Sequence, residues 1–466
     1  MKKHNLIKVV AITILVFVLL SWIFPTASYS STQGLVEAER VQVGFYELFN
    51  YPSLAMSYFG YIFVFVLMIG AFYEILSKTG AYRELVDRLV KQFKGRESLF
   101  LATTMVILAA ITSFSGLSVG LMFVFPFLIA LILSMGYGKL TAAATTVGSV
   151  MVGLIGTTFG NTSVYYLNYY LGTELTTQIW PKVIILIIGL ALLIFNVLKY
   201  AKKTKNDVDL VKEDYIPEKV KGKHAIWPLV VIFDLLLIIM VIAQLPWEEW
   251  GITLFTDMTE AIADFEVFGF PIFGKILGAV LPFGQWSIFD FAILLFIAGA
   301  VIAFIYKLKV SQWISAMCDG FKKFALPATL MMILYMCLII ATYHQFQLVI
   351  IDAILSITSG LNSFTMAIAT FLASVFNMDP MYVAAGTVPY VASLYTDLTT
   401  SGYGIIAVIY QSMYGLAMLV APTSVILIGT LAYLKIPYGK WLKHIWKLFV
   451  ELLVILLIIF TILVLM

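Results

Sequence analysis

Long apolar runs separated by short polar stretches run the length of this sequence. Because these runs do not alternate between apolar and polar residues, they predict helices rather than the strands of a membrane barrel. Each approaches the roughly 20 residues that a helix needs to cross the hydrocarbon core of a bilayer. The predominantly apolar segments lie at 9–24, 54–76, 98–114, 117–135, 141–160, 183–199, 225–245, 287–306, 327–343, 364–377, 403–434 and 448–466. The pattern predicts an all-α polytopic membrane protein with about ten to twelve transmembrane segments.

Composition supports the same class. Of the 466 residues, 62% are apolar and 12% are charged, whereas soluble domains carry about 25% charged residues. The two cysteines, Cys318 and Cys337, form no metal-binding or redox motif,. The sequence contains no HExxH, GxSxG or complete nucleotide-binding motif,. We therefore expect no enzymatic activity, no cofactor and no nucleic-acid partner.

The basic residues predict the topology. The stretches 1–8, 77–97, 199–224, 306–326 and 435–447 hold 25 of the 29 lysines and arginines. The positive-inside rule assigns all five to the cytoplasm, so the N-terminus is expected inside and the C-terminus outside the cell membrane. The acidic segment 246–285 is expected outside. The basic start and the run at 9–24 also fit a signal peptide, but we interpret this run as the first span.

An internal repeat is predicted from two matching tripeptides. Gly136-Tyr137-Gly138 and Gly402-Tyr403-Gly404 are each followed, 20 and 21 residues after the tyrosine, by a hydroxyl pair. The flanking charges orient the first copy outward and the second inward, which is typical of the inverted repeats of secondary transporters. We expect a re-entrant hairpin and a broken helix in each copy.

The repeat and the charges together predict four regions. A first repeat is expected at 1–199 and a cytoplasmic linker at 200–224. An extra span and an external loop follow at 225–286, and the second, inverted repeat at 287–466.

Four polar clusters interrupt the apolar runs, at 112–118, 156–163, 374–380 and 421–424. Non-helical backbone survives in a membrane only where it is buried in protein or lines a cavity, so these clusters are candidates for a binding site. Hydroxyl and carbonyl oxygens suit a dehydrated Na⁺, and the N-termini of half-helices suit a carboxylate. Close helix packing is the alternative role. The candidate substrate- or ion-binding residues are Ser113, Ser115, Thr157, Thr158, Asn161, Thr162, Asn377, Asp379, Thr423 and Ser424.

Two acids inside apolar regions bear on ion coupling. Asp379 lies at the predicted tip of the second hairpin and could hold a cation or a substrate amino group,. Asp234 lies within a span outside both repeats, and its role stays open between structural pairing and proton coupling. No metal is expected beyond a transported Na⁺, and the coupling ion would be Na⁺ or H⁺.

Four further features of the sequence are Lys78-Thr-Gly-Ala81-Tyr-Arg83, the exit from the first hairpin at Pro126 to Tyr137, Asn377, and Ala421-Pro-Thr-Ser with the following Ile436-Pro-Tyr-Gly-Lys-Trp-Leu442. Together they resemble the motifs of the DcuC/YfcC carriers of the ion-transporter superfamily. The resemblance spans most of the chain. It implies a scaffold domain, a moving transport domain with two hairpins, elevator-type alternating access and a homodimer. Carriers of this kind are assigned to C4-dicarboxylates or basic amino acids.

The sequence therefore favours a secondary active transporter for a small carboxylate-bearing metabolite, ion-coupled or working by exchange. Its partners would be that metabolite, the lipid bilayer and a second copy of the chain. A Na⁺/H⁺ or other cation exchanger is one alternative, and a membrane scaffold or sensor that transports nothing is another.

Overall fold

The computed structural model of this chain describes residues 4–205, 215–220, 222, 224–278 and 280–466, without the side chains of 161–163. Among the described residues, nine helices are long and apolar enough to cross a membrane. Three shorter apolar helices lie at Gly120–Ser134, Lys139–Ile155 and Ser363–Asn377. Together these twelve segments coincide with the twelve apolar runs, so the predicted helical membrane fold is confirmed.

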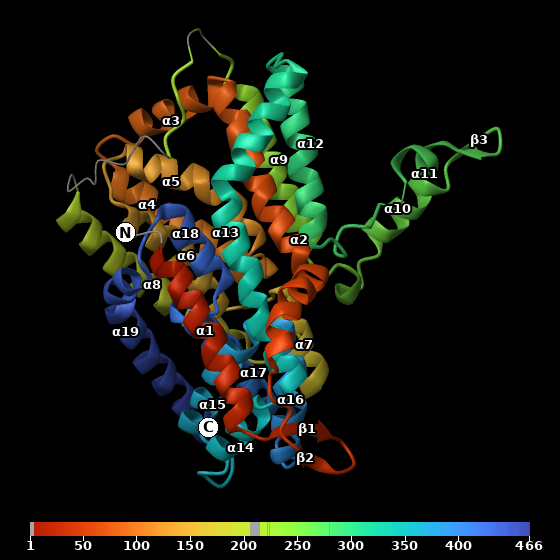
Figure 1. Cartoon of the computed structure of the whole chain (residues 1–466), viewed down its shortest axis with the longest axis vertical. Coiled ribbons are helices and arrows are strands. Elements are labelled where there is room, and N and C mark those ends of the chain that lie inside the picture. Colours follow the sequence, from red (N-terminus) through yellow and green to blue (C-terminus); the bar gives the residue numbers. More distant parts are fainter. Residues whose placement is uncertain (1–3, 206–214, 221, 223, 279) are drawn as a thin grey trace.

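The two halves of the chain repeat one order of elements (Figure 1). In the first half the elements are α1 (His4–Ile23), α2 (Phe45–Lys78), α3 (Ala81–Gln92), α4 (Glu97–Ser115), the 3₁₀-helix η1 (Gly120–Val124) with α5 (Phe125–Ser134), α6 (Lys139–Ile155), α7 (Asn161–Leu171) and α8 (Ile179–Thr204). Their counterparts are α12 (Ile288–Ile305), α13 (Val310–His344), α14 (Gln347–Leu355), α15 (Ser363–Asn377), α16 (Pro380–Leu394), α17 (Thr400–Val420), α18 (Val425–Leu434) and α19 (Tyr438–Leu465). Helix α9 (Trp227–Gln244) lies between the halves.

Packing between the halves follows the same correspondence. Helix α1 packs on α13 while α12 packs on α2, and α7 contacts α17 while α18 contacts α6. The pairs α2 and α13, α6 and α17, and α8 and α19 each join an element to its own counterpart. In Figure 1, α3 lies at one end of the bundle and its counterpart α14 at the other. The two copies are therefore antiparallel, as the inverted repeat predicts.

Two glycines let the longest helices, α2 and α13, touch backbone to backbone. A Cβ atom added to Gly70 would lie 2.4 Å from the carbonyl oxygen of Gly320, and one added to Gly320 would lie 2.3 Å from that of Gly70. Small residues at a crossing allow membrane helices to gain close van der Waals contact. This crossing joins the two repeats along their common core.

The sequence analysis did not predict the β-hairpin of β1 (Thr26–Ser30) and β2 (Gly34–Ala38). An isolated two-stranded hairpin is marginally stable at best. Here Ala27 is fully buried against Leu348 and Tyr390 of the second repeat, and its N–H donates to the carbonyl of Gln345 at 3.1 Å. Contacts distant in sequence therefore stabilise the hairpin.

Between α9 and α12 the chain forms an arm that projects sideways from the bundle (Figure 1). Its elements are η2 (Glu248–Trp250), α10 (Leu254–Ala263), β3 (Glu266–Val267), β4 (Phe270–Pro271) and α11 (Ile272–Leu277). This is the acidic segment that the sequence places outside the membrane.

Candidate functional site

A cavity of about 300 Å³ lies where the tips of the two hairpins meet. The first tip, Gly116–Gly120, joins α4 to η1, and the second, Met378–Pro380, joins α15 to α16. The start of α18, from Ser424 to Ile426, forms a further wall. We call this space the central cavity. Its walls come from both repeats.

Four helical segments begin at the wall of the central cavity. They are η1 at Gly120, α12 at Ile288, α16 at Pro380 and α18 at Val425, and all four residues line the cavity. The first N–H groups of a helix have no acceptor within that helix, and the helix dipole makes this end positive. Helix N-termini are therefore favourable places for an anion. Their convergence gives the central cavity the character of an anion site built from backbone.

Asp379 is the acid of the central cavity. Its Oδ1 atom accepts a hydrogen bond from the backbone N–H of Met381 at 2.9 Å and so caps the N-terminus of α16. Of the described residues that line the cavity, no other is an Asp or Glu, and none is a Lys, Arg or His. A dianion in this cavity would therefore meet one carboxylate and no basic side chain.

Three tyrosines in the cavity wall were missed by the sequence analysis. Tyr61 of α2, Tyr335 of α13 and Tyr414 of α17 all line the central cavity. The Tyr414 hydroxyl donates to the carbonyl of Met378 at 3.1 Å and so supports the second tip. A tyrosine within an apolar span resembles core or lipid-facing residues in sequence, so no local signal identifies it.

Ser113 and Thr158, predicted as ligands, are not among the residues that line the cavity and instead hold the first hairpin to the first helix break. The Ser113 hydroxyl donates to the carbonyl of Gly156 at 2.6 Å. The Ser113 carbonyl accepts from the backbone N–H groups of Thr158, Phe159 and Gly160 at 3.0, 3.3 and 3.2 Å. These bonds satisfy backbone donors that the break leaves without partners inside the helix. In this conformation the two side chains act as structural ties.

The second repeat has a matching tie. The Thr423 hydroxyl donates to the carbonyl of Val375 at 3.0 Å, which joins the second break to the second hairpin. Asn377 is buried and donates from Nδ2 to the carbonyl of Ala373 at 3.1 Å. Ser424, by contrast, lines the central cavity.

The remaining predicted residues either do not line the central cavity or have side chains outside the described part of the structure. The Ser115 hydroxyl donates to the carbonyl of Ile111 within α4, and the hydroxyl of Thr157, which lies in the first helix break, donates back to the carbonyl of Leu154 in α6. The side chains of Asn161 and Thr162 lie outside the described residues. Asp234 is exposed on α9 and is not among the residues that line the cavity. Of the predicted set, Asp379 and Ser424 meet in the central cavity.

A helical membrane protein with two inverted repeats, whose hairpin tips line a small cavity, has the architecture of a secondary carrier. The sequence matches the C4-dicarboxylate anaerobic carrier family, DcuC, over residues 4–465. The chain belongs to this family and is a multi-pass membrane carrier. A carrier is consistent with the expectation that the protein is not an enzyme.

Among solved structures, the chain is similar to the YdaH transporter of Alcanivorax borkumensis, with 14% identity and a TM-score of 0.44. That comparison covers 99% of this chain and 98% of the other. It is also similar to MtrF of Neisseria gonorrhoeae, described as one of a class of antimetabolite efflux pumps, with 13% identity and a TM-score of 0.39. The second comparison covers 98% of this chain and 94% of MtrF. A search of curated proteins found no match to the sequence.

Proposed function

We propose that this protein is a secondary active transporter that carries a small carboxylate-bearing metabolite across the cell membrane and binds it in the central cavity. The observation that carries the proposal is the meeting of four helix N-termini at one cavity that both repeats line. Cavities of this size accommodate small metabolites. The family description favours a C4-dicarboxylate, and an amino acid is the other substrate class.

Charge balance supports cation coupling. A dicarboxylate beside the Asp379 carboxylate brings three negative charges together if no proton is bound. Helix N-termini contribute about half a positive charge each, and no basic side chain lines the cavity among the described residues. A co-bound Na⁺ or H⁺ would lower the electrostatic cost. We therefore place the coupling cation beside Asp379.

The inverted repeats support an elevator-type mechanism. The hairpins and broken helices would move as one transport domain against a scaffold that includes α2 and α13, whose backbones touch at Gly70 and Gly320. The protein would work as a homodimer in the cell membrane, with the N-terminus in the cytoplasm.

Uptake into proteoliposomes tests the proposal. Purified protein should accumulate radiolabelled succinate or an amino acid only when a Na⁺ or H⁺ gradient or an exchangeable substrate is supplied. Ser424→Ala should weaken transport because Ser424 lines the cavity. Ser393→Ala is the matched control, since that hydroxyl donates to the carbonyl of Tyr390 at 2.7 Å and Ser393 is not among the residues lining the cavity. Equal transport by both variants and the wild type would remove the central cavity as the site.

A cation exchanger is the second candidate, and the carboxylate of Asp379 in the cavity favours it. The same vesicles separate the two functions. An exchanger moves Na⁺ or H⁺ without any carboxylate present, whereas a coupled carrier needs the organic substrate for cation movement.

A further inference from the structure

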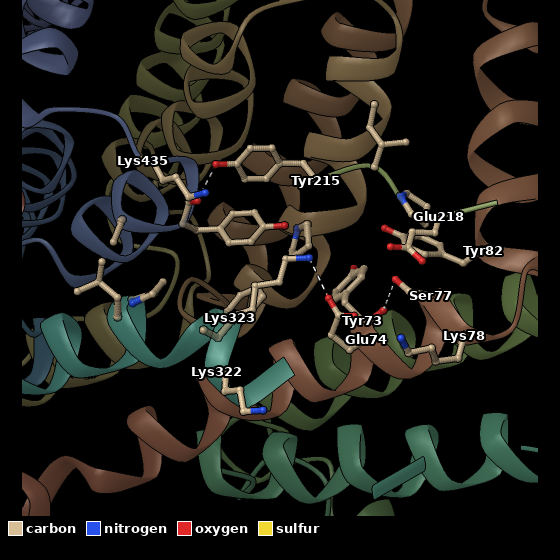
Figure 2. A pocket seen from close by; sticks show the side chains of 18 residues that line it. Tyr73, Glu74, Ser77, Lys78, Tyr82, Tyr215, Glu218, Lys322, Lys323 and Lys435 are labelled. Atoms are coloured by element: carbon tan, nitrogen blue, oxygen red, sulfur yellow. Dashed lines mark hydrogen bonds and ion pairs between the residues drawn. The ribbon is translucent and has the colours of Figure 1, made fainter. Parts of the chain in front are cut away.

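A second and larger cavity, of about 490 Å³, has no lining residue in common with the central cavity among the described residues. Figure 2 shows it from close by. Of the residues that the structure describes, four lysines and two glutamates line it: Lys78, Lys322, Lys323, Lys435, Glu74 and Glu218. We call it the lysine cavity. Residues from four of the five basic stretches of the sequence contribute to its lining, so the fold gathers these stretches at one end of the bundle.

Part of the segment that connects the two repeats forms a wall of the lysine cavity. Tyr215, Pro217 and Glu218 all line it. The carbonyl of Pro217 accepts a hydrogen bond from Nη1 of Arg83 at 3.1 Å, and the Tyr215 hydroxyl donates to the carbonyl of Tyr433 at 3.1 Å. These bonds fix the connecting chain to α3 on one side and to α18 on the other. The lysines are exposed and thus lie around an open cleft, one wall of which the connecting chain forms.

The charge of the lysine cavity is positive. Lys323 forms an ion pair with Glu74 at 2.8 Å, and Lys322 contacts Asp319, which is outside the lining, at 3.3 Å. Four lysines against two glutamates leave an excess of positive charge in the wall. A cleft lined by one sign of charge concentrates ions of the opposite sign near it. The lysine cavity is therefore suited to anions.

A line of smaller spaces joins the two cavities along α2 and α18. Ile426 lines the central cavity, and one helical turn further along α18, Thr430 lines a void of about 20 Å³. On α2, Ile62 of the central cavity is followed one turn later by Val66 of the same void. Tyr433, a further turn along α18, lines both the void and the lysine cavity. The three spaces follow one another along a single seam.

The seam is closed by aromatic and apolar residues. The rings of Phe324 and Tyr433 stack with centroids 4.8 Å apart and planes at 29°, and both residues separate the small void from the lysine cavity. A void of this volume holds about one water molecule. In this conformation the central cavity and the lysine cavity are thus two spaces with a closed constriction between them.

We propose that the lysine cavity is a second anion site, which binds the carboxylate groups of the transported substrate as it enters or leaves at the basic end of the bundle. This inference rests on the transport function proposed above. The ligand would be a small, water-soluble molecule with two negative charges. The headgroup of an anionic lipid also carries negative charge and could bind the same lysines, and the experiment below separates these two ligands.

The test measures succinate transport from each side of oriented proteoliposomes. Cys318 is exposed and lies in the same basic stretch as Lys322, whereas Cys337 is buried. A membrane-impermeant maleimide therefore reports the orientation of the protein through Cys318. The test variant is Lys78→Gln with Lys322→Gln, which leaves the ion pair of Lys323 with Glu74 intact.

The matched control is Lys91→Gln with Lys443→Gln. Both lysines are exposed in basic stretches and do not line the lysine cavity, so the control removes the same charge from the same end. The test variant should raise the KM for succinate at the lysine end several-fold and leave the KM at the other end unchanged. The difference should disappear in about 1 M KCl, where the screening length falls to about 3 Å. The control variant should keep the wild-type KM on both sides.

Two results would overturn the inference while leaving the transport function in place. One is an equal KM for test variant, control and wild type at the lysine end. The other is a difference that occurs in vesicles with anionic lipid and not in vesicles of phosphatidylcholine alone, which would assign the lysines to a lipid headgroup. Absence of succinate transport by the wild type, from either side, would instead refute the proposed substrate.

Discussion

Asp379 has two physical roles in this structure, and two substitutions separate them. Its Oδ1 atom caps α16 through the N–H of Met381 at 2.9 Å, and its negative charge lies in the wall of the central cavity. Asp379→Asn keeps a good capping residue and removes the charge, whereas Asp379→Ala removes both. Comparing them isolates the contribution of charge to cation coupling.

The expected magnitudes differ for the two roles. Loss of an N-cap side chain costs about 1 kcal/mol of folding free energy. A unit cation about 4 Å from the carboxylate gains about 4 kcal/mol at an effective dielectric constant near 20. Solvent in the cavity screens part of that attraction, yet about 1.4 kcal/mol is already a tenfold change in affinity. We expect both variants to need about tenfold or more additional Na⁺ or H⁺ for half-maximal succinate uptake.

A matched control lies at the other end of the same hairpin. Asn362 caps α15, and its Oδ1 atom accepts from the N–H groups of Phe364 and Thr365 at 2.9 and 3.3 Å. Asn362 is not among the residues that line the central cavity. Asn362→Ala should therefore destabilise the protein about as much as Asp379→Ala and leave the cation dependence of uptake unchanged.

The assay combines thermal unfolding in detergent with uptake at graded cation concentrations. Asp379→Asn should unfold close to the wild-type temperature, and the two alanine variants at similar, lower temperatures. Wild-type cation dependence in Asp379→Asn would refute the placement of the coupling cation. A cation dependence altered equally by Asn362→Ala would show that the effect reflects stability and not charge.

Two further predictions concern how the structure holds the cavity in place. Gly320→Ala should destabilise the protein by about 1–3 kcal/mol, because the added methyl group would overlap the backbone of Gly70,. Gly439→Ala is the control, because nothing lies within 4 Å of the added Cβ, and it should leave the unfolding temperature unchanged or raise it. An equal loss of stability in both variants would contradict the close crossing of α2 and α13. Thr423→Ala should lower the free energy of unfolding by about 1 kcal/mol and reduce succinate uptake, because the Thr423 hydroxyl ties the second break to Val375. Uptake at the wild-type rate would show that this hydrogen bond does not maintain the site.

The sequence predicted the architecture because membrane folding leaves strong local signals. Apolar runs of sufficient length identify the spans. Lysine and arginine cluster in the loops that the positive-inside rule assigns to the cytoplasm, and this predicts the direction in which each span crosses the membrane. Polar residues with glycine or proline inside an apolar run identify the hairpin tips and helix breaks, such as Gly116 and Met378-Asp379-Pro380. Local pattern also found the two predicted residues that meet in the cavity, Asp379 and Ser424.

Local pattern did not show which polar side chains face the cavity. Polar side chains near a helix break can serve two purposes. They can bond the backbone groups that the break leaves without partners, or they can bind a ligand. Ser113 serves the break, whereas Ser424 lines the cavity, although both lie in similar polar clusters. The tyrosines of the wall give no signal within an apolar span. These assignments depend on how helices distant in sequence are rotated against one another.

The gathering of the lysines around a second cavity is also a tertiary feature. The positive-inside rule places Lys78, Lys322 and Lys435 on one side of the membrane and leaves their mutual distances open. The crossing of α2 and α13 and the path of the connecting segment bring them to one space. Sidedness could thus be predicted from sequence, whereas the cavity could not.

The most direct test of the account asks whether substrate occupies the space between the hairpin tips. Ser118 lines the central cavity, so Ser118→Cys places a thiol in the cavity wall. The native Cys318 is exposed, does not line the central cavity and serves as the internal control. The rate of maleimide labelling at each position is measured by mass spectrometry while succinate is increased. The account predicts slower labelling at position 118, with half-protection near the concentration that half-saturates uptake, and constant labelling at Cys318. An unchanged rate at position 118 when uptake is saturated would contradict the central cavity as the substrate site.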